Sequence, residues 1–333
     1  MRMLIQSWRT KTRRAVRVSL EKMFRPPAEK FLRHPGKVYE SLVSARGAET
    51  DPVETISLLT QGEQPLCVGR FGRTELQMAQ RWRSKQFGGI GWQVLDSLAS
   101  GDPHFYFRRA ALLLEGTGIR PLTSSVLERF YELTVNSLRE VDVLGSWAPG
   151  EMWFEDELTE AKIVTLHDLE PYRHPKPWSS ALEGKKVLVI HPYVESITSQ
   201  YEKYGDRLFG NKGVLPPFIL STYRPPQAYF GEIPGAEEWF DHLDRMVADM
   251  RTLDFDIAII GAGPFGMPLA AAIKRMGRQA LHLGGATQLL FGIHGNRWSS
   301  DPVLMSITNE YWTKPLPSET PPVAQRIEKG AYW

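Results

Sequence analysis

Residues 254–298, DFDIAIIGAGPFGMPLAAAIKRMGRQALHLGGATQLLFGIHGNRW, contain two successive patterns of strand, glycine turn and helix. The first joins the apolar run Ile257–Ile260 to the turn 261–266, GAGPFG. The second joins the apolar run 279–283 to Gly284 and Gly285. In a parallel α/β sheet, such turns direct backbone N–H groups and a helix N-terminus at a phosphate. The stretch therefore predicts a nucleotide or another phosphorylated ligand along one edge of a sheet.

The first turn fits the dinucleotide fingerprint G-x-G-x-x-G through Gly261, Gly263 and Gly266. That fingerprint also requires an acidic residue about 20 positions later, at the end of the next strand, to bind ribose hydroxyls. Here the next strand ends in HLGG, residues 282–285, without an Asp or Glu. The missing acid counts against an NAD(P) site. The structural alternative is that the glycines only let helix and strand pack closely.

Length and composition predict a globular α/β protein. The chain has 333 residues, of which 42% are hydrophobic and 23% charged, enough for one large domain or two small ones. Cys67 is the single cysteine, which excludes an internal disulfide framework and a cysteine-based zinc site and suits the cytoplasm. No apolar run approaches the roughly 18 residues of a membrane-spanning helix.

The N-terminal segment is strongly basic. Residues 1–33 hold ten Lys and Arg against two Glu, a net charge of +8, whereas the rest holds 30 basic and 36 acidic residues, a net charge of −6. We expect residues 1–35 to form a basic amphipathic helical leader and residues 36–333 the main domain. Such a leader fits an anionic membrane, which predicts a cytoplasmic protein, peripheral at the inner face of the plasma membrane. The alternative is a helix packed on the domain; nucleic acid is disfavoured because the domain is acidic.

Strand and helix patterns alternate along the domain, which predicts a Rossmann-like, doubly wound and mostly parallel sheet. Ligands of such sheets lie outside the carboxyl ends of the strands. Strands are expected at residues 65–69, 141–144, 162–166, 186–190, 218–222, 257–260 and 279–283. Helical segments are expected at 39–59, with an interruption at Gly47, and at 74–83, 103–114, 124–139, 196–209, 239–251 and 267–276.

Several of these segments, in this order, resemble one enzyme family. They are PLCVGRFGRTEL (65–76), LEPY (169–172) with KKVLVIHPYVESI (185–197), the 254–298 block, and a tail with NEYW and IEKGAYW. Together they resemble the GT-D-fold bacterial glycosyltransferases of polysaccharide and glycan assembly. The resemblance covers residues 63–333. It implies a GT-D-type Rossmann-like domain, a nucleoside-diphosphate sugar donor, usually linked to UDP, and a lipid-linked or growing glycan as acceptor.

The chain departs from this family in the loop after the first strand. The family's loop usually reads R-F-G-D-G-E, and its Asp-x-Glu pair is expected to engage the donor and a divalent cation. Arg70, Gly72 and Glu75 match, but Arg73 stands at the Asp position. A carboxylate pair offers oxygens to Mn²⁺ or Mg²⁺, whereas Arg73 offers a permanent charge that can neutralise a diphosphate. We therefore expect reduced metal dependence and assign no metal ligand.

Two carboxylates are candidates for catalysis. By resemblance, Glu310 in the segment NEYW is the base that takes a proton from the acceptor, beside aromatic rings suited to a sugar. Glu75 is the second candidate, as an acceptor of hydrogen bonds in the donor site. Glu310 has a structural alternative, as a capping carboxylate, and Glu75 has one as a helix N-terminal carboxylate.

The remaining candidates are expected to bind the donor at the ends of strands. His191 follows the strand at 186–190, with Glu195 four residues on, and Arg297 follows a glycine-containing loop. His191 is equally compatible with a core imidazole. The full set of expected donor-binding residues is Arg70, Gly72, Arg73, His191, Glu195, Gly261, Gly263, Gly266, Gly284, Gly285 and Arg297.

Three functions follow from these observations. The leading one is a nucleotide-sugar-dependent glycosyltransferase. The second is an NAD(P)-dependent oxidoreductase, against which the missing ribose-binding acid counts. The third is a catalytically inactive scaffold in a polysaccharide-assembly complex, which the loss of the family's Asp would fit.

Overall fold

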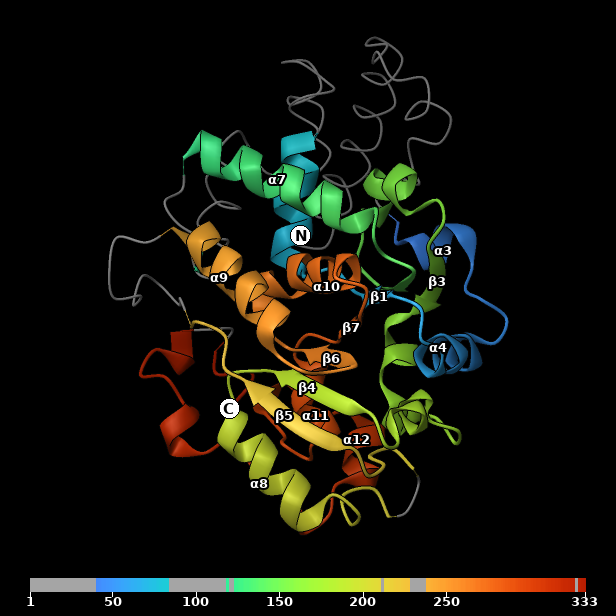
Figure 1. The fold of residues 1–333 in the computed structure, drawn as a ribbon, viewed down its shortest axis with the longest axis vertical. Helices are drawn as coiled ribbons and strands as arrows, with labels where there is room; N and C mark the ends of the chain where they lie inside the picture. Colours follow the sequence, from blue (N-terminus) through green and yellow to red (C-terminus); the bar gives the residue numbers. More distant parts are fainter. Residues whose placement is uncertain (1–39, 84–117, 120–122, 211–212, 228–237, 327–328) are drawn as a thin grey trace, which may run out of the picture.

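The computed structural model contains one sheet of seven parallel strands (Figure 1). It describes residues 40–83, 118–119, 123–210, 213–227, 238–326 and 329–333. The strand order is β3-β2-β1-β7-β6-β4-β5. The strands are β1 (Leu66–Gly69), β2 (Val143–Ser146), β3 (Lys162–Thr165), β4 (Lys186–Ile190), β5 (Ile219–Tyr223), β6 (Ile257–Ile260) and β7 (Gln279–His282).

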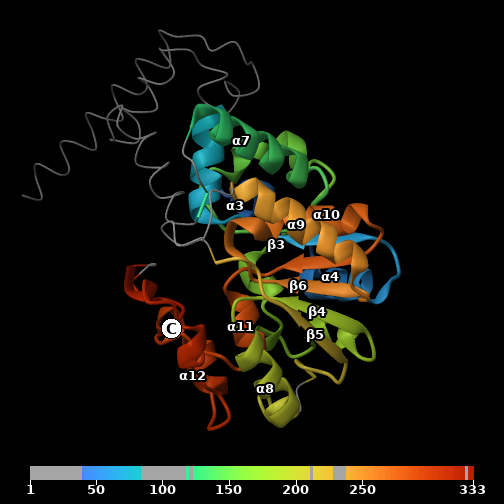
Figure 2. The same cartoon turned by 60° about the vertical axis from the view of Figure 1, so that its left-hand side comes forward.

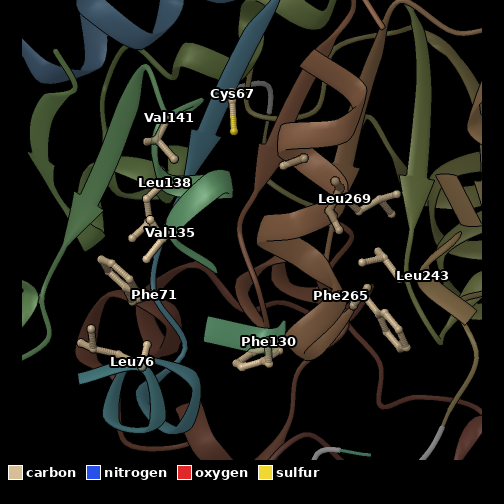
Figure 3. Close-up of a cluster of buried hydrophobic side chains, with 14 of the residues drawn as sticks. Cys67, Phe71, Leu76, Phe130, Val135, Leu138, Val141, Leu243, Phe265 and Leu269 are labelled. Atoms are coloured by element: carbon tan, nitrogen blue, oxygen red, sulfur yellow. The ribbon is translucent and has the colours of Figure 1, made fainter. Parts of the chain in front are cut away.

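Helices cover both faces of the sheet, as the Rossmann-like prediction required (Figures 1 and 2). Alternate residues of a strand enter different cores: Val187 and Val189 pack on one face, and Leu188 and Ile190 on the other. One face carries α7 (Ser124–Leu138), α9 (Trp239–Thr252) and α10 (Gly266–Arg275), and its core is shown in Figure 3. The other carries α4 (Pro52–Gln61), α8 (Val194–Tyr204), α11 (Ala286–Leu290) and α12 (Pro302–Ile307).

The helices begin at local capping signals. The Thr123 side chain accepts a hydrogen bond from the Val126 N–H at the start of α7. Glu238 and Asp241 form a reciprocal capping box at the start of α9. Short 3₁₀ helices fill several connections: η2 (Glu151–Leu158), η3 (Leu166–Leu169), η4 (Pro171–Arg173), η5 (Trp178–Leu182), η7 (Gly263–Phe265), η8 (Asn296–Trp298), η9 (Pro317–Glu319) and η10 (Ala324–Arg326).

All seven expected strands are present, with ends that differ by at most two residues. The helical stretch expected at 39–59, interrupted at Gly47, is present as two helices, α3 (Leu42–Arg46) and α4. Gly47 takes a positive φ of 83° and Pro52 starts the second helix. The leader at 1–35 and the helix expected at 103–114 lie outside the described residues.

Two properties of the chain bear on its environment. Within the described ranges, no helix combines the length and apolar character needed to cross a membrane. Cys67 is fully buried in the core beneath α10, and burial raises the pKa of its thiol to about 12. It is therefore a structural thiol rather than a nucleophile.

Candidate functional site

A pocket opens at the carboxyl edge of the sheet. The loops after β1, β2, β4, β6 and β7 all contribute to it, because these strands are parallel and adjacent in the sheet. Ten of the residues expected from the sequence line it, namely Arg70, Gly72, Arg73, Glu75, His191, Gly261, Gly263, Gly284, Gly285 and Arg297. Glu195, Gly266 and Glu310 are not among the lining residues.

Two arginines of the loop after β1 meet one indole ring. The guanidinium carbons of Arg70 and Arg73 lie 5.2 and 5.5 Å from the ring centroid of Trp147. The Trp147 indole N–H donates to the Phe71 carbonyl over 3.1 Å, which ties the loop after β2 to the loop after β1. Trp147 was not among the candidates, although it directly follows β2, which extends two residues beyond the expected strand.

A buried carboxylate fixes the position of Trp147. Glu151 is fully buried and accepts hydrogen bonds from the N–H groups of Trp147 (3.0 Å) and Ala148 (2.9 Å). It also accepts from the Ser146 hydroxyl and from the Leu42 N–H at 3.1 Å. Four donors on one carboxylate hold this loop in one conformation. The indole that contacts Arg70 and Arg73 is thus part of a rigid scaffold.

Glu75 lies in the first turn of the helix at residues 73–83. Its carboxylate folds back over Gly72, where an added Cβ would collide with it. Glu75 is half-buried and is the only Asp or Glu among the described residues that line the pocket. Across the described parts of the chain, no three His, Cys, Asp or Glu side chains are grouped so that they could hold a metal ion.

The three glycines of the first turn have different roles. An added Cβ on Gly261 would lie 2.5 Å from His191 and 2.8 Å from the Gly284 carbonyl, and one on Gly266 would collide with His282. Close packing therefore accounts for Gly261 and Gly266. Gly263 instead takes a positive φ of 54°, and among the described residues no atom beyond its chain neighbours lies within 4 Å of the position of an added Cβ. Gly263 is the position at which a ligand can approach the backbone.

The second glycine pair is covered by the end of the chain. An added Cβ on Gly285 would lie 2.6 Å from the Tyr332 ring, so Gly285 accommodates that ring. Gly284 has a φ of 62°, and an added Cβ would lie 3.3 Å from the Arg70 guanidinium. Tyr332 and Trp333 both line the pocket. No local pattern in the sequence could place them there, because they lie nearly 50 residues from the turn that they cover.

Burial keeps both pocket histidines neutral. It lowers the pKa of His191 to about 3, and burial together with the charge of Arg70 lowers that of His282 to about 3. His191 Nδ1 accepts a hydrogen bond from the Tyr193 N–H over 3.0 Å, so its proton is on Nε2. His191 is both a buried imidazole and a pocket residue, and it can donate a hydrogen bond but not act as an acid near neutral pH.

These two pKa values predict a loss of stability in mild acid. An unfolded histidine has a pKa of ~6.5, so below that pH the unfolded chain binds protons that the folded protein does not. The stability from the neutral imidazoles is complete above ~6.5 and falls as the pH decreases towards 3. Each imidazole contributes ~1.4 kcal/mol for every pH unit below ~6.5 and almost nothing above it, so the free energy of unfolding should fall by ~3 kcal/mol between pH values of about 7.5 and 5.5.

Urea denaturation at several pH values measures this dependence. His191→Gln and His282→Asn should each remove about half of the histidine contribution to the slope, as two independent groups would. The slope, rather than the absolute stability, is the readout, because either substitution also changes core packing. Unchanged slopes in both variants would contradict the assignment of two neutral imidazoles.

The structure does not bring Glu195 and Glu310 to the pocket. The Glu195 carboxylate is half-exposed and pairs with Arg224, outside the rim. Glu310 is exposed, and its neighbour Asn309 donates to the carbonyls of Arg207 and Leu208, beyond the last turn of α8. Asn309 thus lies past the end of α8 that is farther from the pocket, and the adjoining Glu310 does not line the pocket.

The motif LEPY also has a structural role. Glu170 pairs with Arg173, and Arg173 pairs in turn with Asp301, which caps the start of α12. The Arg173 and Glu170 side chains are only 12% and 9% exposed, so this ion-pair chain is largely shielded from water. It joins the loop after β3 to the C-terminal segment and does not reach the pocket.

Searches against protein-family models, curated proteins and solved structures find no match to this chain. The pocket geometry and the motif resemblance therefore carry the functional argument. The fold class limits the location of a ligand to the carboxyl edge of the sheet, but it does not select a reaction.

Proposed function

We propose that this protein is a GT-D-type glycosyltransferase that moves a hexose from UDP to a lipid-linked or growing glycan. One observation carries the proposal: the same pocket combines two arginines on one indole, an open glycine turn at Gly263 and the carboxylate of Glu75. Guanidinium groups can bind the diphosphate, the open backbone at Gly263 lets a phosphate approach its N–H groups, and a carboxylate can act as the base. These are the groups that sugar transfer from a nucleoside diphosphate requires.

The diphosphate would be bound by permanent charges and neutral donors. Arg70 and Arg73 can each form two parallel hydrogen bonds to phosphate oxygens. The N–H of neutral His191 adds a donor without an additional charge. Arg297, which also lines the pocket, supplies a third guanidinium. Together these groups would neutralise the charge that develops on the leaving UDP, the task that a divalent cation performs with an Asp-x-Glu pair.

Glu75 would act as the base in place of Glu310, which lies outside the pocket. Its carboxylate takes the proton of the acceptor hydroxyl while that oxygen forms a bond to the anomeric carbon. The bond from the anomeric carbon to the diphosphate oxygen breaks, and the electron pair leaves with UDP. The NAD(P) alternative has less support, because the end of β7 holds His282 where a ribose-binding acid belongs.

The basic leader fits this role. A net charge of +8 over residues 1–33 would hold the enzyme at anionic lipid on the cytoplasmic face, where a lipid-linked acceptor is presented. This segment lies outside the described residues, so the proposal for it rests on charge and composition alone.

Ligand-dependent thermal stabilisation tests the proposed donor class. In a panel of UDP-, GDP- and dTDP-linked sugars, only the UDP-linked sugars should stabilise the protein. At 100 times its dissociation constant, such a sugar should raise the free energy of unfolding by ~2.7 kcal/mol. NAD(H) and NADP(H) are the matched controls for the oxidoreductase alternative. Stabilisation by a nicotinamide cofactor but by no sugar nucleotide would refute the proposal. UDP-sugar binding without transfer to any glycan acceptor would favour the scaffold.

Chelation tests the role of Arg73. We expect sugar transfer to continue in EDTA, because a guanidinium stands where the family carries a metal-binding Asp. Arg73→Asp recreates the Asp-x-Glu pair with Glu75 and should make transfer dependent on Mn²⁺ or Mg²⁺. If EDTA abolishes transfer by the unaltered enzyme and Mn²⁺ or Mg²⁺ restores it, the role given to Arg73 is wrong.

A further inference from the structure

The two ends of the pocket differ in chemistry. The end formed after β1 and β2 carries Glu75 and the arginines on Trp147. The end formed after β4 and by the C-terminal segment carries the aromatic rings of Tyr193, Tyr332 and Trp333. The Tyr332 ring packs on Gly285, after β7, whereas the Glu75 carboxylate folds over Gly72, after β1. The aromatic rings and the carboxylate therefore belong to different loops of the carboxyl edge, and the Arg70 guanidinium lies over Gly284 between them.

The middle of the pocket suits the phosphates. Gly263 offers open backbone after β6, and the Arg70 guanidinium lies over Gly284 after β7. A diphosphate placed between these turns can contact both a backbone N–H group and a guanidinium. The base and the sugar must then occupy opposite ends.

Tyr332 is held as a fixed aromatic wall. Arg297 donates to its hydroxyl over 2.9 Å, and its ring packs on Gly285. Its backbone carbonyl accepts from Gln288 Nε2 at 3.2 Å and from the Tyr193 hydroxyl at 3.4 Å. A ring fixed at its edge and through its backbone loses little entropy when a nucleobase stacks on it.

Gln288 adds a polar group at the same end. It lines the pocket, is only 1% exposed, and its Nε2 donates to the carbonyls of Ile293 and Tyr332. These two bonds fix the orientation of the amide, and Oε1 has no hydrogen-bond partner among the residues that the structure describes. An unsatisfied buried acceptor is costly. A uracil N–H group would satisfy it.

We infer that the donor binds in one direction, with the nucleobase at Tyr332 and Gln288 and the transferred sugar at Glu75. This inference rests on the proposed function and adds the orientation of the donor to it. It makes Tyr332 and Gln288 specificity-determining residues for the base, and it places the reacting carbon next to the only carboxylate among the described pocket residues.

Single engineered cysteines can test the orientation. The native Cys67 is fully buried with a raised pKa, so it provides an unreactive background. Tyr332→Cys places a cysteine at the nucleobase end, and Glu75→Cys places one at the sugar end. Arg297→Cys is a second variant for the nucleobase end in case Tyr332→Cys folds poorly. One probe is UDP with a chloroacetamide on the uracil ring, and the other is a UDP-sugar with the same group on the sugar.

We expect the uracil probe to alkylate Cys at position 332 or 297, and the sugar probe to alkylate Cys at position 75. Each of these matched combinations of probe and cysteine should react at least ~10-fold faster than the same cysteine with the other probe, since proximity raises the effective concentration of the electrophile. Excess UDP should protect the base-end cysteine. Intact-protein mass spectrometry gives the rates.

A binding measurement supports the labelling. Tyr332→Ala should weaken UDP and the UDP-sugar by the same factor, ~5- to 150-fold for one lost base stack, whereas Tyr332→Phe, which keeps the ring, should bind both nearly normally. Reversed or unselective labelling, with UDP still stabilising the protein, would overturn the orientation and leave the proposed function standing. If UDP neither protects a cysteine nor stabilises the protein, the proposed function fails and the orientation with it.

Discussion

Glu75→Gln should lower the rate of sugar transfer by ~10²–10⁴-fold, the usual cost of losing a general base. The amide keeps nearly the same shape over Gly72, but it cannot take a proton from the acceptor. Because Glu75 lies at the sugar end of the pocket, the affinity for UDP alone should stay close to normal. Rapid-quench measurement of transfer and calorimetric titration with UDP separate the two effects.

Glu310→Gln is the matched control. Glu310 is exposed beyond the far end of α8, so its substitution should leave transfer nearly unchanged. The opposite result, a large loss in Glu310→Gln and a normal rate in Glu75→Gln, would restore the role that the resemblance implies for Glu310. It would also require a movement of the C-terminal segment that brings Glu310 to the donor.

Glu151→Ala should have the largest effect on folding. The substitution removes the acceptor of four donors, three of them backbone N–H groups of Leu42, Trp147 and Ala148. Each buried donor left without a partner costs ~1–3 kcal/mol. Partial relaxation makes the total loss in free energy of unfolding ~3–5 kcal/mol. Urea denaturation monitored by circular dichroism measures it.

Glu155→Ala provides the comparison within the same 3₁₀ helix. Glu155 is exposed, and its removal should change the free energy of unfolding by no more than ~0.5 kcal/mol. Equal effects of the two substitutions would show that Glu151 does not organise the loop that carries Trp147. If the Glu151→Ala protein is stable and binds UDP with normal affinity, Trp147 does not act as the support of Arg70 and Arg73.

The strands were predictable because their signal is local. Runs such as Ile257–Ile260 are apolar throughout, as expected of parallel strands buried on both faces, and turn residues bound them. The strand ends then located most of the pocket, since parallel strands bring their carboxyl ends to one edge. The break at Gly47 was predictable for a similar reason, because glycine interrupts a helical pattern and here takes a positive φ.

The parts of the site that depend on long-range packing were not predictable. Nothing near Gly285 in the sequence indicates that Tyr332 covers it, nor does the segment around Glu310 show that it packs at the far end of α8. The sequence also could not divide the fingerprint glycines into packing positions and one open position, Gly263. That division depends on where His191 and His282 lie.

A crystal structure with UDP bound tests the central claim most directly, that the pocket at the carboxyl edge of the sheet holds a nucleoside diphosphate. The account predicts phosphate oxygens within hydrogen-bond distance, ~2.7–3.2 Å, of the Arg70 guanidinium and close to the Gly263 turn, with the uracil ring on Tyr332. A diphosphate bound away from both Arg70 and Gly263 would contradict it.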